Sequence, residues 1–273
     1  MKTRVSHYRI RIPEKYDQPE KAFHAVFLSD QHDRDVLKDG RFMETLCEAD
    51  PAAVFCGGDM LNAGGADRGH AKNALRLYEA LSARFKVYAV DGNHEGRLKA
   101  HPSDYLIDYN DYAHELESMG VTLLGGRREE IRPGGARMEI AGFELPLSSY
   151  NRMHPVMPGS GELRRALGEK NREAFTILLA HHPDGFPSYR EWGADLVLSG
   201  HFHGGLIVLP HFGGMAGGSL KPFPKYCRGS FEEGTSRMIV SAGIGEHTKA
   251  LRINNPYEIT VLEFLQRDKR PSS

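Results

Sequence analysis

The sequence predicts an α/β fold in which short buried strands alternate with helices and end in polar loops. Three apolar segments, at residues 25–28, 53–56 and 85–90, are each followed at once by polar residues or glycine. Such runs are typical of strands that are buried on both faces of a sheet. Helical periodicity lies between them, near residues 36–48 and 68–83. The resulting order is strand, helix, strand, helix, strand.

The second half of the chain adds two more buried strands and the beginning of a second sheet. Residues 175–180 run into His181, and residues 196–198 run into the polar segment 199–203. In open α/β sheets ligands bind outside the carboxyl ends of the strands, so these polar loops can converge on one crevice. We expect short antiparallel strands of a second sheet, separated by glycine and proline turns, at residues 121–124, 129–131 and 137–143.

Length and composition favour a single domain. The 273 residues contain no repeat of fixed period, and we predict one domain over residues 1–273 with its core at residues 23–265. Residues 210–234 are dense in glycine, proline and aromatic residues without a clear period. This composition indicates a long loop beside the site that forms part of the substrate wall.

Charge and cysteine usage limit the classes of partner and the compartment. The 35 Lys and Arg against 36 Asp and Glu give a formal net charge of -1, so no overall positive field favours sequence-specific nucleic-acid binding. Three irregularly spaced cysteines, Cys47, Cys56 and Cys227, are interpreted as reduced thiols. We find no signal peptide and no apolar run of the ~18 residues that a membrane helix needs. We therefore expect a cytoplasmic protein without a transmembrane segment, either free or peripheral to the membrane.

Five short motifs place carboxylate, amide and imidazole groups directly after the predicted strands. Oxygen and nitrogen donors of this mixture suit Mn, Fe or Zn at a catalytic site, whereas structural zinc sites are richer in thiolates. One aspartate after a strand is commonly only a helix cap or turn former, but five such motifs in order favour function. In an extended segment, side chains two residues apart share a face and can turn towards one cavity. The motifs are Asp30-x-His32, Gly58-Asp59, Gly92-Asn93-His94-Glu95, His181 and Gly200-His201-x-His203.

In this order the motifs resemble the signature of the calcineurin-like metallophosphoesterase superfamily, D-x-H, G-D, G-N-H-[DE], H and G-H-x-H. The C-terminal segment from Gly243 to Pro256 resembles the bacterial YkuE- and YaeI-like branch of that superfamily. The resemblance implies a four-layer α/β/β/α sandwich, in which two mixed β-sheets are flanked by helices. It also implies two divalent metal ions, one held by Asp30, His32, Asp59 and His203, the other by Asp59, Asn93, His181 and His201, with Asp59 bridging both.

The same resemblance implies a dinuclear phosphohydrolase. Two divalent ions bring more positive charge than Asp30 and Asp59 neutralise, and the surplus favours a phosphate group. Paired ions can clamp the attacking and departing oxygens of a displacement, and we expect a metal-bridging hydroxide as the nucleophile. His94 lies outside the implied metal ligands. We expect it to donate a proton to the leaving oxygen or to hydrogen-bond it.

The substrate is predicted only as a class, a small phosphorylated molecule. It would contain a phosphodiester, pyrophosphate or phosphomonoester bond, and the branch resemblance makes lipid-linked compounds plausible. His247 and Arg252 are candidate substrate-binding residues, because an arginine can hold a phosphate with two donors. Phe202 and Leu206 replace the Thr and Gln that are usual in the branch's pattern. The substrate of the branch is therefore not carried over to this chain.

Two other interpretations remain open. Some members of the superfamily, such as the retromer scaffold subunit, bind partners instead of hydrolysing phosphate, but such proteins often lack metal-binding or acid residues that are present here. A two-metal aminopeptidase would use similar ligands and leaves Asn93 and His94 unexplained. Of the adjacent His181 and His182, only one can face the site from an extended segment. We assign His181 as the ligand.

Overall fold

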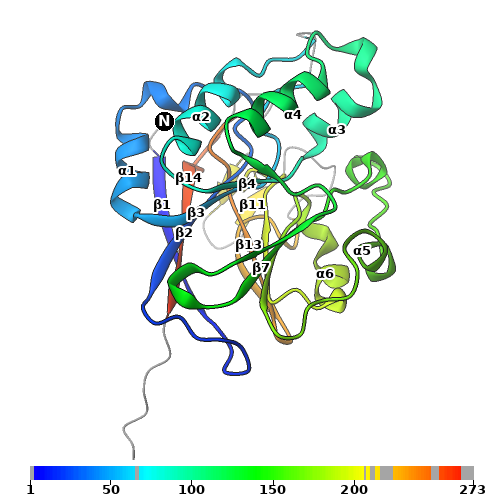
Figure 1. Ribbon diagram of the computed structural model, residues 1–273. Helices are drawn as coiled ribbons and strands as arrows, with labels where there is room; N and C mark the ends of the chain where they lie inside the picture. The colour runs from blue at the N-terminus through cyan, green and yellow to red at the C-terminus, as the bar shows by residue number, and fades with distance from the viewer. Residues whose placement is uncertain are drawn as a thin grey trace, which may run out of the picture.

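Two six-stranded sheets form the centre of the computed structural model, which describes residues 3–64, 68–205, 207–209, 213–215, 224–246 and 252–265 (Figure 1). The first sheet has the order β1 (Thr3–Arg11), β14 (Tyr257–Leu265), β2 (Phe23–Leu28), β3 (Pro51–Cys56), β4 (Val87–Ala89) and β5 (Thr122–Leu123). Its neighbouring strands are parallel except for β14 and β2.

The second sheet is also mixed. Its order is β12 (Gly229–Glu233), β13 (Ser236–Val240), β9 (Leu196–Ser199), β8 (Phe175–Leu179), β7 (Met138–Gly142) and β6 (Arg128–Ile131). The pair at each edge is antiparallel, and the central pairs are parallel. A separate antiparallel ribbon consists of β10 (Ile207–Leu209) and β11 (Gly213–Met215).

Alternating side chains of the strands divide the core into three apolar zones. In β2, Val26 and Leu28 belong to the zone under the helices of the first sheet, whereas Phe27 belongs to the zone between the sheets. In β8, Ile177 lies between the sheets and Leu178 packs in the zone under the helices of the second sheet. This two-residue period gives the order helix, sheet, sheet, helix. The predicted four-layer α/β/β/α fold is confirmed.

Amphipathic helices cover the outer faces of the two sheets (Figure 1). On the first sheet, Leu46, Leu77 and Leu116 are buried in the zone under the helices, and on the second sheet Leu163 and Trp192 are buried in the corresponding zone. The α-helices are α1 (Arg41–Ala49), α2 (Lys72–Ser82), α3 (Asn93–Ala100), α4 (Tyr109–Ser118), α5 (Ser160–Leu167) and α6 (Phe186–Trp192). The 3₁₀ turns are η1 (Val36–Lys38), η2 (Pro102–Asp104), η3 (Pro133–Gly135), η4 (Leu147–Tyr150) and η5 (Pro183–Gly185).

The observed pairing corrects several details of the predicted elements. Residues 121–124 contain β5, which pairs in parallel with β4 in the first sheet, because α3 and α4 supply the crossover that parallel pairing needs. β7 is antiparallel to β6 but parallel to β8. The helix expected at residues 36–48 is divided into η1 and α1.

The predicted loop at residues 210–234 is only partly a loop. Residues 213–215 form β11, and residues 229–233 form β12, which turns back into β13. Gly234 has a φ of 63° at this turn, a conformation that glycine adopts without strain. Residues 210–212 and 216–223 lie outside the described residues.

Candidate metal centre

The predicted site residues lie together where the carboxyl ends of strands from both sheets meet. The first sheet supplies Asp30, His32, Asp59, Asn93 and His94 after β2, β3 and β4, and the second sheet supplies His181, His201 and His203 after β8 and β9. Asn93 begins α3 beside Asp59, since the N–H of the next residue, His94, donates to Oδ1 of Asp59 at 2.8 Å. Residues that are distant in the chain therefore share one site.

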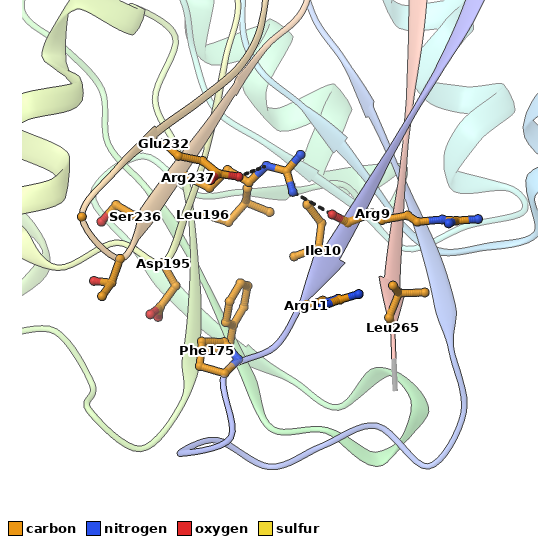
Figure 2. A pocket seen from close by; sticks show the side chains of 13 residues that line it. Arg9, Ile10, Arg11, Phe175, Asp195, Leu196, Glu232, Ser236, Arg237 and Leu265 are labelled. Carbon is orange, nitrogen blue, oxygen red and sulfur yellow. Dashed lines mark hydrogen bonds and ion pairs between the residues drawn. The ribbon is translucent and has the colours of Figure 1, made fainter. Parts of the chain in front are cut away.

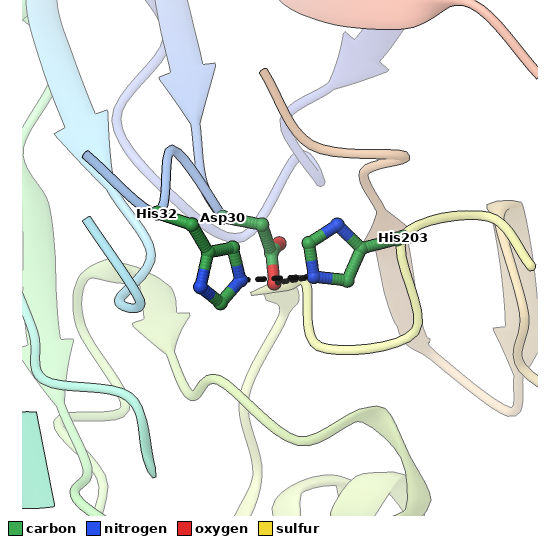
Figure 3. A group of neighbouring side chains, drawn as sticks. All are labelled: Asp30, His32 and His203. Carbon is green, nitrogen blue, oxygen red and sulfur yellow. Dashed lines mark hydrogen bonds and ion pairs between the residues drawn. The ribbon is translucent and has the colours of Figure 1, made fainter. Parts of the chain in front are cut away.

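Asp30, His32 and His203 form one compact group (Figure 3). Nε2 of His32 lies 3.0 Å from Nε2 of His203, and the same atom of His203 lies 3.4 Å from Oδ1 of Asp30. The three potential ligand atoms lie within 4.8 Å of one another. Their nitrogen and oxygen chemistry and their spacing suit a single transition-metal cation.

Asp59 lies between this group and a second one. Its Oδ2 is 3.8 Å from Nε2 of His32 and 3.2 Å from Nε2 of His181. Asp59, His181 and His201 also offer one ligand atom each within 4.8 Å of one another. One carboxylate thus faces both groups of histidines.

Left-handed backbone turns many of these side chains into the site. Such φ values are uncommon for residues with a Cβ and concentrate at functional sites. The explanation offered from the sequence, that residues two apart share one face of an extended segment, is therefore wrong for these pairs. Each side chain is directed by its own backbone turn. The φ values are 54° at Asp30, 47° at His32, 52° at Asp59, 71° at His201 and 52° at His203.

Two motif glycines allow backbone donors to reach the carboxylates. A Cβ on Gly92 would overlap Oδ1 of Asp59, and a Cβ on Gly200 would overlap Oδ2 of Asp30. Because neither glycine carries a Cβ, Asp59 can accept the N–H of His94, and Oδ1 of Asp30 can accept the N–H of His201 at 3.0 Å. Charge-assisted bonds of this kind fix the orientation of both carboxylates.

Glu95, which received no role from the sequence, joins the loop after β3 to the start of α3. Its buried carboxylate accepts hydrogen bonds at 2.8 to 3.2 Å from the backbone N–H groups of Asp59, Met60, Leu61 and Gly92. A glutamate at the third position of a helix is the usual partner in a capping box, so the sequence did carry this signal. Glu95 holds the loop that carries Asp59 in place.

His94 presents an N–H group to the site. Its Nδ1 accepts the backbone N–H of Ala63 at 2.8 Å, so in the neutral ring the proton is on Nε2. That Nε2 lies 3.9 Å from Oδ2 of Asp59 and 3.5 Å from Nη1 of Arg97. A backbone donor leaves no signal in residue type, and Ala63 could not have been found from the sequence. Arg97 follows His94 at helical spacing and could have been found.

Electrostatics and a buried unpaired oxygen both favour a cation at this site. Burial raises the pKa of Asp30 to about 6. Burial alone would lower the pKa of His181, but the carboxylates of Asp59 and Asp30 raise it to about 10. Oδ1 of Asn93 is buried without a hydrogen-bond partner among the described residues, and Nε2 of His181 is buried 3.2 Å from Oδ2 of Asp59. Nδ1 of His181 lies 2.6 Å from the carbonyl oxygen of Gly57, which leaves Nε2 as the ligand atom of the neutral ring. The residues present therefore fit divalent metal ions.

The remaining candidates occupy different surroundings. Nη2 of Arg252 lies 3.1 Å from Nδ1 of His203 and donates to the carbonyl oxygen of Gly245 at 2.6 Å. These contacts place Arg252 on the Nδ1 side of His203, and its binding of substrate stays a prediction.

His247 lies outside the described residues. His182 is buried; its ring lies 4.3 Å from that of His201, and its Nδ1 accepts the N–H of Asp184 at 3.2 Å.

A cavity of about 410 Å³ lies at the other end of the strands and contains none of the predicted residues (Figure 2). It opens at the amino ends of β8 and β9, near Phe175 and Leu196. Two of its charged groups are engaged within the protein, since Arg237 donates to the carbonyl oxygen of Arg9 at 2.7 Å and Asp195 lies 2.9 Å from Lys170. Of the helices in the described part of the chain, none is both long enough and apolar enough to span a bilayer.

The chain belongs to the calcineurin-like phosphoesterase family, whose sequence pattern matches residues 23–205. It is similar to the uncharacterized metallophosphoesterase YkuE of Bacillus subtilis (strain 168), with 27% identity over 92% of this chain and 80% of that protein. It is also similar to the phosphodiesterase YaeI of Escherichia coli (strain K12), with 26% identity over 66% of this chain and 58% of that protein. The predicted resemblance to the YkuE- and YaeI-like branch is confirmed.

One solved structure supports the fold alone. It is a putative 5'-nucleotidase from Staphylococcus aureus in complex with alpha-ketoglutarate, with a TM-score of 0.52 and 11% sequence identity over 92% of this chain and 56% of that one.

Proposed function

We propose that the chain is a dinuclear, metal-dependent phosphoesterase. The observation that carries this proposal is the position of Asp59, whose Oδ2 lies 3.8 Å from Nε2 of His32 and 3.2 Å from Nε2 of His181. A carboxylate between two histidine groups suits a bridging ligand of paired cations. The proposed ligands of one ion are Asp30, His32, Asp59 and His203, and those of the other are Asp59, Asn93, His181 and His201.

The residues around the proposed ions would orient a phosphoester and stabilise its leaving oxygen. When bound, two divalent ions such as Mn, Fe or Zn would neutralise the phosphate oxygens and lower the pKa of an attacking water. Hydrogen bonds from His201 and His94 backbone N–H groups hold Asp30 and Asp59 in the orientation that ligation needs. His94, whose Nε2–H is directed to the site by Ala63, would donate a hydrogen bond to the leaving oxygen and stabilise its negative charge.

The proposed substrates are small molecules with a phosphodiester, pyrophosphate or phosphomonoester bond, and lipid-linked compounds belong to the same proposal. The name of YaeI as a phosphodiesterase supports a diester for this chain. We place the protein in the cytoplasm, because Cys47, Cys56 and Cys227 are free cysteines and free thiols are typical of reducing compartments.

The proposal is tested with purified protein that has been loaded with Mn. Metal content is measured by elemental analysis, and hydrolysis is measured with bis(4-nitrophenyl) phosphate and 4-nitrophenyl phosphate. Asp59→Ala and His201→Ala should each lose metal and lower kcat/KM at least ~100-fold, because removal of a metal ligand or of its support costs this much. Asp17→Ala and His114→Ala, at exposed positions, are the matched controls and should retain activity.

Undiminished turnover in Asp59→Ala would contradict the assignment of the centre. A wild-type protein that binds no metal and hydrolyses neither compound would favour the non-catalytic scaffold instead.

A further inference from the structure

Arg97 lies beside His94, the proposed hydrogen-bond donor to the leaving oxygen, on the same face of α3. It follows His94 by three residues, a spacing that brings side chains together on a helix. Its Nη1 lies 3.5 Å from Nε2 of His94 and donates to the carbonyl oxygen of Ala63 at 3.2 Å. Ala63 therefore contacts both side chains, with its N–H on Nδ1 of His94 and its carbonyl oxygen on Arg97. The arginine and the histidine are positioned as a pair.

The contact between Arg97 and His94 is one between two donors. A guanidinium has no acceptor, and Nε2 of the neutral His94 carries a hydrogen because Nδ1 is occupied by the N–H of Ala63. Two N–H groups that point side by side do not stabilise each other. They can stabilise an oxygen, or two oxygens of one group, that accepts from both.

The charge of Arg97 is not neutralised by a carboxylate of the described residues. Lys99, two residues further along α3, shows the contrast, since its Nζ lies 2.7 Å from Asp91 and 2.6 Å from Glu144. The ion pairs of the described part of the chain include none with Arg97, although its side chain is half-buried. A partly buried and unpaired guanidinium is costly unless an anion joins it.

We propose that Arg97 binds an anionic group on the leaving part of the substrate, and that the substrate is a diester of diphosphate. This inference rests on the proposed function, in which His94 faces the leaving oxygen. In a diphosphate the leaving oxygen belongs to a second phosphate, whose other oxygens lie within reach of the guanidinium fork. In a simple phosphodiester the leaving group is an uncharged alcohol, and Arg97 would gain no partner.

The chemical step balances with water as the only co-reactant. A water oxygen forms a new bond to the phosphorus held at the centre, and the bond from that phosphorus to the bridging oxygen breaks. The bridging oxygen departs as an oxygen of the second phosphate and accepts a hydrogen bond from Nε2 of His94, while the water gives up one proton to the solvent. The products are two phosphomonoesters.

The experiment compares two substrates in the same Mn-loaded protein, a nucleoside diphosphate sugar and bis(4-nitrophenyl) phosphate. Arg97→Met should lower kcat/KM for the diphosphate about 10- to 100-fold, the range of one charge-assisted hydrogen bond. For the diester the loss should stay below roughly 3-fold, because the departing 4-nitrophenolate carries no second phosphate for Arg97 to bind. Arg97→Lys keeps the charge without the fork and should give an intermediate loss.

Binding supplies a readout that does not depend on turnover. A methylene diphosphonate analogue, in which carbon replaces the bridging oxygen, is titrated into each variant by calorimetry, and Arg97→Met should weaken its binding about 10-fold or more. Arg165→Met is the matched control. Arg165 is also in the last turn of its helix, and its side chain is 78% exposed and pairs only loosely with Glu162 at 3.7 Å. Metal content and melting temperature should not differ between the variants.

The outcomes separate this inference from the proposed function. Equal losses on both substrates in Arg97→Met, or a wild-type protein that hydrolyses the diester but not the diphosphate, would overturn the inference and leave the phosphoesterase intact. A metal-loaded wild-type protein that hydrolyses neither substrate would overturn both.

Discussion

The backbone N–H of His201 donates to Oδ1 of Asp30 at 3.0 Å, and this hydrogen bond joins the loops of the two sheets. Asp30 follows β2 of the first sheet, whereas His201 follows β9 of the second. A donor that lies far away in the chain therefore orients the carboxylate. The centre forms only when the sheets pack correctly against each other.

Gly200→Ala should disrupt the centre at this contact. The new Cβ would overlap Oδ2 of Asp30 and Oγ of Ser29, so we expect metal content to fall and kcat/KM to drop at least ~10-fold, as for an overpacked contact. Elemental analysis and hydrolysis of bis(4-nitrophenyl) phosphate measure the two effects. Gly161→Ala, where a Cβ meets nothing within 4 Å, is the control. Full metal content and activity in Gly200→Ala would contradict the geometry described for Asp30.

Glu95→Gln should destabilise the protein even without metal. The carboxylate accepts four backbone N–H groups, and an amide NH₂ in its place would face donors. We expect the free energy of unfolding to fall by about 1 to 3 kcal/mol, the cost of unsatisfied buried donors. Urea unfolding of the metal-free protein measures it. Glu117→Gln, at an exposed position of α4, should change little; an equally stable Glu95→Gln would show that these bonds contribute nothing.

Much of the fold and of the site was predictable because each depends on local patterns. The apolar strands and the polar residues that end them are periodic features of the sequence, and the predicted site residues that the structure describes gather as expected. The sheet to which β5 belongs was not predictable from residues 121–124. The choice depends on the crossover through α3 and α4, which is a tertiary relationship.

The local geometry of the proposed ligands could also not be predicted from the sequence. Asp30 and His32 converge through left-handed backbone, whereas their spacing suggested an extended segment. Non-glycine residues adopt such φ values only when surrounding contacts impose them. The N–H of Ala63, which sets the tautomer of His94, carries no side-chain signal at all.

His94→Gln should lower kcat about 10²- to 10³-fold while metal content is retained, because the loss of a positioned N–H donor to a developing oxyanion costs on this scale and His94 is not a proposed ligand. The loss should be greater for phenyl esters than for 4-nitrophenyl esters, since a poorer leaving group keeps more negative charge on the oxygen that His94 would contact. Steady-state kinetics on both esters measure this difference. His114→Gln, on the exposed surface of α4, is the control. The same loss on both esters would argue against a hydrogen bond from His94 to the leaving oxygen.

Glu258 should make stability depend on pH in the acidic range. Burial alone would raise its pKa, but hydrogen bonds from Ser6, Arg4 and the N–H of Ala242 hold it below the usual 4.5. A lowered carboxyl pKa stabilises the fold fully above the unfolded value near 4.5, and this contribution is lost as the pH falls through the folded value. Between pH ~3 and ~6, the free energy of unfolding measured in urea should therefore fall more steeply with decreasing pH in wild type than in Glu258→Gln. Glu263→Gln, whose ion pair with Arg9 is more exposed, should retain the wild-type slope; identical slopes in wild type and Glu258→Gln would refute the assignment.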